Sequence, residues 1–393
     1  MSTKNWKLAF LVVGLCFLNA LLVGSVFAQE AENAQGIDQE KKLVPKSKEV
    51  ETERKQSGIV PPLWQSGQER PLSSFLRLVT SDTNSRLFRL GDLSETPRVT
   101  RPRLLGDLAP LGIMVNDPVA GPFYVPSVRS FKMGDMQSPQ PQNGFYYGFN
   151  TFQNLYRPIN RSLGGNVTDI QVSRNTIGIE RTVLDEYTSV SLVLPFYSAS
   201  ARSATVADLN GSRGTVGDLT VILKRAFWES EYRDAMASMG IAVTAPTGPD
   251  NLFGSSRVPS LHDTTLQPFV GFLATKDRWY VQGFVSLDVP TNSDNVTLLF
   301  TDLGVRYALY QDERARILQS ITPTAEIHVV TPLNHQGIRI TDPAGSPDQV
   351  NVTAGVEFVL LNGRLHALFG VVTPLVGPRI MDFEVLSQVK FKY

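Results

Sequence analysis

The chain has 393 residues, of which 42% are hydrophobic and 9% aromatic, so it is long enough for a sizeable core or a large sheet. Its 37 basic residues balance its 37 acidic residues, and this neutrality gives no support for nucleic-acid binding, which needs a basic surface. The one cysteine, Cys16, lies among the first 28 residues, so the rest of the chain offers no disulfide and no thiolate metal site.

Residues 1–28 have the features of a secretory signal peptide. Lys4 and Lys7 precede an uncharged apolar run, and Val26-Phe27-Ala28 places small side chains at the −3 and −1 positions of a cleavage site. An uncleaved anchor is the alternative, because about 20 apolar residues can span a bilayer. We expect cleavage after Ala28 and export of the remainder.

Two segments with little periodicity follow. Residues 29–74 are rich in Gln, Glu, Lys and Pro and have few aromatic side chains, so we expect a disordered polar leader. A charged helix over 41–55 is the alternative. Residues 75–143 carry many Pro and Gly residues and only short apolar clusters, and no strand or helix period persists there. We expect this irregular segment to act as a plug in, or a cap on, the structure that follows.

From residue 144 onward the dominant period is two, as in a half-buried strand. The pattern is clearest at the C-terminus, where apolar and charged residues alternate between Met381 and Tyr393. Asn362-Gly363 between two alternating runs predicts a hairpin with a type I′ turn. We predict about twelve strands, an even number as bacterial membrane barrels require. Their ranges are 144–154, 168–184, 187–198, 215–229, 232–246, 264–275, 278–290, 296–311, 316–333, 349–361, 364–376 and 379–393.

Three features favour an antiparallel up-and-down transmembrane β-barrel (an all-β fold) over a soluble β-sandwich. One face of the strands carries many charges, which suits a wet lumen. Aromatic side chains gather near strand ends, as in Trp279-Tyr280, where a membrane interface would hold them. The last strand ends on an aromatic residue, which resembles the signal that the barrel-assembly machinery reads for insertion. The residues of that signal are Val389, Phe391 and Tyr393, and the candidate pore-lumen residues are Asp302, Arg306, Glu326, His328, Glu357, Arg364, His366, Asp382 and Glu384.

Parts of the barrel region resemble known families. Residues 216–224 (VGDLTVILK) and 240–250 (GIAVTAPTGPD) resemble a segment of outer-membrane transporters linked to meta-pathway phenol degradation and hydrophobic-compound uptake. Residues 136–141, 146–150 and 177–182 resemble a set of planctomycete signal-peptide proteins. The resemblance covers about residues 130–393 and implies passage of small molecules across an outer membrane.

The histidines invite two other interpretations. His262-Asp263, with Ser260 nearby, suggests a hydrolase, but a catalytic triad is defined by geometry, and no nucleophile motif is present. Glu326 and His328 point to one face of a strand and would bind a metal if a neighbouring strand supplied further ligands. A solvated pair in the lumen is the simpler interpretation, so we expect no catalytic residue, no cofactor and no metal.

We therefore expect an outer-membrane channel or transporter for passive passage of small molecules in a bacterium, and not an enzyme. Its partners would be outer-membrane lipid, the barrel-assembly machinery and a small solute, with no nucleic acid. The alternative is a non-conducting barrel that anchors or binds envelope material through the 29–74 leader. The sequence leaves the solute and the oligomeric state open.

Overall fold

The computed structural model describes residues 103–107, 112–129, 131–164, 167, 169–203, 209–258, 260, 262–334, 348–377 and 379–393. The predicted signal peptide, the predicted leader and residues 75–102 of the predicted plug segment lie outside this part of the chain.

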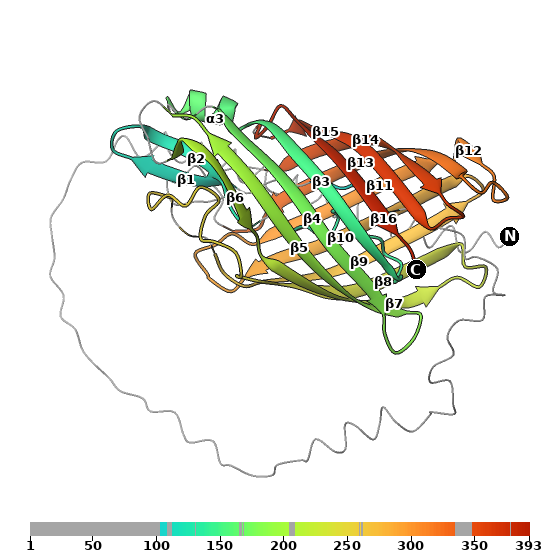
Figure 1. Cartoon of the computed structure of the whole chain (residues 1–393). Helices are drawn as coiled ribbons and strands as arrows, with labels where there is room; N and C mark the ends of the chain where they lie inside the picture. Colours follow the sequence, from blue (N-terminus) through green and yellow to red (C-terminus); the bar gives the residue numbers. More distant parts are fainter. Residues whose placement is uncertain are drawn as a thin grey trace, which may run out of the picture. The chain divides into compact units, whose positions relative to one another are not determined.

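The described residues form a closed antiparallel β-barrel (Figure 1). Its sheet has 14 strands, of which β6 (Gly211–Val216) and β12 (Tyr310–Gln311) are short additions, so twelve close the barrel. Pairing of the last strand with the first closes it, with Phe391 opposite Phe145. The twelve are β3 (Gly144–Leu155), β4 (Ile170–Thr182), β5 (Thr188–Ala201), β7 (Leu219–Glu229), β8 (Ala235–Ala245), β9 (Thr265–Lys276), β10 (Trp279–Pro290), β11 (Leu298–Tyr307), β13 (Leu318–Pro332), β14 (Gln349–Leu360), β15 (Leu365–Val376) and β16 (Phe383–Phe391). The predicted fold class and strand number are confirmed.

The connections differ in length at the two ends of the barrel. At the short-turn end, brief turns join β4 to β5, β7 to β8, β9 to β10 and β14 to β15. At the long-loop end, longer segments join β3 to β4, β5 to β7, β8 to β9 and β13 to β14. The hairpin at Asn362-Gly363 is present, but its turn is not the predicted two-residue type I′ turn. Four residues separate the strands there, and φ is positive at Leu361 (53°) as well as at Asn362 and Gly363.

Two elements at the long-loop end were not predicted. β1 (Gly112–Asp117) and β2 (Gly121–Pro126) form a separate hairpin, and α3 (Arg157–Ser162) follows β3. The Asn160 side chain joins them, because it accepts the Tyr124 N–H at 2.6 Å and donates to the Tyr124 carbonyl at 3.0 Å. Tyr124 also stacks on Tyr156, with ring centroids 5.9 Å apart.

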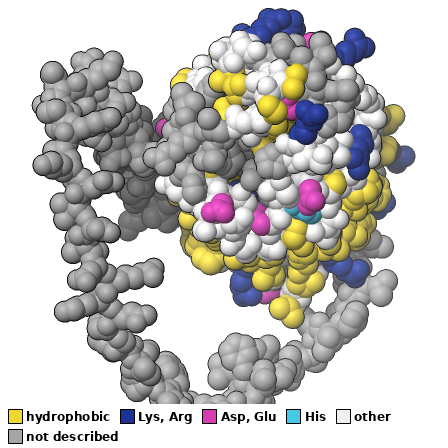
Figure 2. All heavy atoms as spheres, turned by 90° about the vertical axis from the view of Figure 1, so that its left-hand side faces the viewer, with side chains coloured by type: hydrophobic (Ala, Val, Ile, Leu, Met, Phe, Trp, Pro, Cys, Tyr) yellow, Lys and Arg dark blue, Asp and Glu magenta, His cyan; other side chains and the backbone are white. Residues whose placement is uncertain are grey.

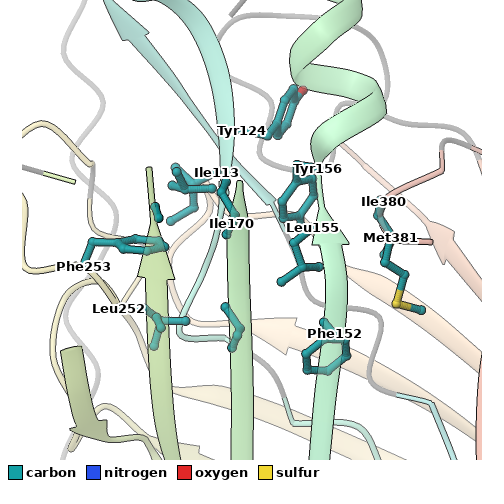
Figure 3. Packing of buried hydrophobic residues seen from close by; sticks show 14 of the residues in the cluster. Ile113, Tyr124, Phe152, Leu155, Tyr156, Ile170, Leu252, Phe253, Ile380 and Met381 are labelled. Carbon is teal, nitrogen blue, oxygen red and sulfur yellow. The ribbon is translucent and has the colours of Figure 1, made fainter. Parts of the chain in front are cut away.

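A buried apolar cluster holds the hairpin against the ends of the barrel strands (Figure 3). Ile113 and Tyr124 from the hairpin meet Phe152, Leu155 and Ile170 of β3 and β4. The last predicted strand was too long for a related reason: Ile380 and Met381 lie in this cluster, so β16 begins only at Phe383.

The outer surface of the barrel is apolar. Outward side chains at alternate strand positions are exposed, for example Leu223 (48%), Val270 (48%) and Phe369 (51%). Trp279 and Tyr307 pair across β10 and β11 at the short-turn end, with ring centroids 4.8 Å apart. Figure 2 shows the long-loop end, where hydrophobic side chains gather toward the edge and acidic ones lie nearer the middle.

No helix in the described part of the chain is long and apolar enough to cross a membrane.

Candidate functional site

The inward face of the barrel wall carries buried polar and charged side chains. Strand alternation sends the residues on one side of each strand inward, so residues two apart along a strand share this face. Seven of the nine predicted lumen residues lie there, each at most 3% exposed. These seven are Asp302, Arg306, Glu326, His328, Glu357, His366 and Glu384.

The other two lie elsewhere. Arg364 is exposed in the turn between β14 and β15, so it is not part of the inward face. Asp382 precedes β16 at the long-loop end, where it accepts a hydrogen bond from Asn154 at 2.6 Å and pairs with Arg379. The predicted strands 364–376 and 379–393 begin before β15 and β16 do, so both residues were wrongly assigned to strands. At the C-terminus, Val389 (41% exposed), Phe391 and Tyr393 lie on the outward side.

Residues 103–143 contact inward side chains from strands around the barrel. Glu326 of β13 accepts the backbone N–H groups of Leu105 at 2.9 Å and Gly106 at 2.8 Å. From β16, Gln388 donates to the Leu105 carbonyl at 2.7 Å, and from β14, Thr353 donates to the Gly106 carbonyl at 3.0 Å. A short backbone stretch that would otherwise leave polar groups unsatisfied is thereby bonded to three strands.

Lys132 is the centre of a buried charge cluster. Its ammonium group bonds to the Asp107 carboxylate and lies 2.8 Å from Asp302 Oδ1 of β11. His328 Nδ1 lies 2.8 Å from the same Asp302 oxygen and 3.3 Å from Asp107. Burial alone would raise the pKa of Asp107, but His328 and Lys132 outweigh it and lower this pKa to about 2. Burial would lower the pKa of Lys132, and the two carboxylates raise it instead.

This cluster contains His328, for which metal binding is the alternative to a solvated pair in the lumen. Asp107, Asp302 and His328 each place one ligand atom within 4.8 Å of the others. The Lys132 ammonium group lies among them and already bonds to both buried carboxylates. A metal ion would have to displace it, so the donor set fits an ion pair better than a metal centre.

Arg306 links two further carboxylates on the inward face. Its guanidinium lies 3.2 Å from Glu326 and 2.7 Å from Glu357. Glu357 in turn pairs with His366 at 2.7 Å. These side chains of opposite charge therefore form pairs on the inward face, and they do not form a ring of one charge.

The sequence interpretation missed other charges on this face. Glu180 of β4 pairs with Arg103 at 2.9 Å and with Lys224 of β7 at 2.8 Å. Arg174 of β4 pairs with Asp135 at 2.6 Å, and burial raises the pKa of that carboxyl despite the arginine. Their spacing along the strand could have predicted this position. Arg174 and Glu180 are six residues apart, an even number, so their side chains point to the same side of β4.

His262 lies at the long-loop end. Its Nε2 is 2.7 Å from Asp218, and its Nδ1 is 3.6 Å from Asp250, so carboxylates face both ring nitrogens. Ser260 contacts His262 through the backbone N–H and not through the ring. Ser260 and His262 therefore do not form the serine-to-imidazole hydrogen bond of a serine hydrolase.

No protein-family model and no curated protein matches the chain. Among solved structures, an outer-membrane channel from Pseudomonas putida F1 is 11% identical, with a TM-score of 0.46 over 66% of this chain and 99% of its own. The NanC porin is 8% identical, with a TM-score of 0.38 over 64% and 100% of the two chains. LpxR from Salmonella typhimurium is 11% identical, with a TM-score of 0.37 over 63% and 100%. These similarities concern the fold alone, and the resemblance to meta-pathway transporters stays a prediction.

Proposed function

We propose that this protein is an outer-membrane channel for small molecules, with residues 103–143 acting as a plug in its lumen. The polarity of the two faces of the barrel wall, which is the reverse of that in a soluble barrel, carries the proposal. Its outward side chains are apolar and exposed, and its inward side chains are polar, charged and buried. A soluble barrel has the opposite arrangement, whereas a membrane barrel needs this one.

The outer surface fits lipid. Soluble proteins rarely expose contiguous apolar patches beyond a few hundred Å². Here outward apolar residues recur on strand after strand, as with Val221, Val305 and Val385. The Trp279–Tyr307 pair at the short-turn end suits the interfacial girdle of such barrels. Lipid would cover this surface in the assembled protein.

The size of the barrel fits a plugged lumen. Barrels of about eight strands are filled by their own side chains, and wider ones leave room inside. Residues 103–143 occupy such room in this proposal. Arg103 bonds to Glu180, which is opposite Gly144 at the start of β3. Asn143 accepts the Thr182 N–H at 2.7 Å. Both ends of the segment therefore lie near the short-turn end, which faces the periplasm in bacterial barrels.

A second candidate is a non-conducting barrel that binds or anchors envelope material. The buried ion pairs of Lys132 and Arg103 favour it, because they fix residues 103–143 to the wall. If that attachment never loosens, the lumen stays closed and the barrel serves another purpose.

The first test is fractionation of the expressed protein, with gel mobility compared before and after boiling. A closed barrel in the outer membrane gives a heat-modifiable band in that fraction. Flux of small solutes into liposomes that contain the purified protein then separates the two candidates. A folded barrel with no flux at any solute size contradicts the channel and favours the anchor.

A further inference from the structure

A small cavity separates residues 103–143 from one side of the barrel wall. It is bounded by Phe131, Asp135, Met136 and Gln137 on the segment, and by inward residues of β3, β4, β5, β7 and β8 on the wall. The cavity leaves about 20 Å³ for the centres of water molecules, which is about the room that one buried water needs.

Four polar atoms on the lining of this cavity have no hydrogen-bond partner among the described residues. They are Asp135 Oδ1, Gln137 Oε1, Arg174 Nε and Thr176 Oγ1. All four side chains are at least 93% buried. Such groups are costly inside a protein unless water or a ligand satisfies them, so the cavity is chemically suited to a hydrogen-bonding guest.

The unpartnered groups continue along the same side of the wall. Gln267 and Gln282 are at most 1% exposed, and both the amide nitrogen and the amide oxygen of each have no partner in the described part of the chain. Ser238 and Ser286 are similar. These four residues lie on β8, β9 and β10, next to the strands that bound the cavity.

The opposite side of the wall is bonded to the segment. Glu326, Thr353 and Gln388 hold its backbone, and Asp302 holds Lys132. The cavity side is attached as well: Lys224 of β7 donates to the Ser138 carbonyl at 2.7 Å. Ion pairs of 2.6 Å join Arg174 of β4 to Asp135 and Asp288 of β10 to Arg129.

We propose that this cavity is the site on the permeation path where the solute binds. The solute in this proposal is a small uncharged molecule with hydroxyl or amide groups. The inference rests on the proposed channel function. Asp135 and Arg174 neutralise each other, with Arg174 Nη2 2.6 Å from Asp135 Oδ2, so the cavity presents no net charge from this pair. What remains is one free N–H donor, two oxygen acceptors and a hydroxyl that does both. Asp218 also lines the cavity, and its Oδ1 is bonded to the Gly248 N–H and to His262 Nε2. Polyols and amides such as urea match the unpartnered set.

The cavity holds about one water molecule in the structure, so a larger solute can bind only if side chains of residues 103–143 move. Phe131 is the side chain to change, because it lines the cavity and is only partly buried. Phe131→Ala is expected to increase glycerol flux severalfold. Phe369→Ala, which removes the same ring from the outward face of β15, is the matched control and leaves glycerol flux unchanged.

The polar atoms are tested with isosteric variants in liposomes, with glycerol and urea as probes and the heat-modifiable band as the check of folding. Thr176→Val removes a hydroxyl that has no partner among the described residues. We expect flux of both probes to fall about three- to tenfold, which corresponds to one neutral hydrogen bond. Thr322→Val, on inward-facing β13, is the control and leaves flux unchanged.

A fall in flux with Thr176→Val but not with Thr322→Val supports the cavity as the place where the solute binds. Normal flux in both threonine variants, or an equal fall in both, contradicts solute binding in the cavity but leaves the proposed channel function intact. Absence of flux in the folded wild-type protein overturns the channel function itself.

Discussion

Lys132 Nζ lies 2.8 Å from Asp302 Oδ1, and both side chains are buried inside the barrel. The contact joins residues 103–143 to β11, and Asp107 binds the same ammonium group. One lysine therefore pairs with two buried carboxylates and weakens the repulsion between them.

Lys132→Met is expected to weaken this attachment strongly. Removal of one partner from a buried ion pair costs about 3–5 kcal/mol, because the remaining charges are left uncompensated. We expect a lower melting temperature of the heat-modifiable form and a larger ionic conductance in planar bilayers. Arg233→Met is the control: Arg233 pairs with Glu186 at 3.9 Å on the surface, and exposed pairs contribute about 0–1 kcal/mol. Equal effects of the two variants would mean that the Lys132 cluster does not hold the segment.

Gly106 is required by both its backbone angle and its neighbours. Its φ is +81°, and an added Cβ would lie 2.6 Å from Asp135 Cα. Gly121 has a similar φ of +75° with nothing within 4 Å, so it is a matched control for backbone strain alone. Both alanine variants carry the strain of about 1–3 kcal/mol that such angles impose on other residues. We expect Gly106→Ala to lower the urea midpoint clearly more than Gly121→Ala, and equal midpoints would exclude close packing at Gly106.

The barrel could be predicted from the sequence because alternation is a local property. Each strand, such as Trp279–Pro290, shows in its own residues which side is apolar. Strand ends were harder, because they depend on packing: Met381 continues the alternating pattern but lies in the cluster with Tyr124 and outside β16.

The path of residues 103–143 could not be predicted, because it depends on contacts between distant parts of the chain. A signal was nevertheless present in the inward glycines. A Cβ at Gly304 would lie 2.6 Å from Leu104 Cδ2, and one at Gly355 would lie 2.4 Å from Leu105 Cδ1. Glycine within a strand often marks the close approach of another backbone or side chain. Leu386 is apolar at a position of β16 where the alternating pattern places polar residues, and it lies inward and buried for the same reason. Its Cδ1 and Leu105 Cδ1 both lie near Gly370.

We expect an arginine introduced on the outward face of the barrel to lower the stability of the protein. Leu223 is 48% exposed on the outward side of β7, whereas Leu184 is 93% exposed in the short turn between β4 and β5. An arginine at the bilayer midplane costs about 2–4 kcal/mol and near the interface about 0–1 kcal/mol. In urea unfolding from vesicles, Leu223→Arg should therefore be much less stable than Leu184→Arg. Equal stability would indicate that β7 does not face lipid.

Acid is expected to loosen the segment only at low pH. The pKa of Asp107 falls from its ordinary value of 3.8 to about 2. The stabilisation that its ionised form contributes is therefore complete above pH 3.8 and disappears as the pH falls toward 2. Protease cleavage within residues 103–143 should be slow at about pH 5 and faster below about pH 3. Asp107→Asn should be cleaved faster at about pH 5 with little further change on acidification; a wild-type-like acid response in that variant would assign the effect to another group.

In the proposed channel, residues 103–143 close a lumen that would otherwise conduct. Planar-bilayer conductance of the wild-type barrel, compared with a variant lacking residues 103–142, tests it most directly, with the heat-modifiable band as evidence that both fold. We predict small or rare openings in the wild-type protein and a large, steady conductance in the variant. Equal conductance in two folded barrels would contradict the account.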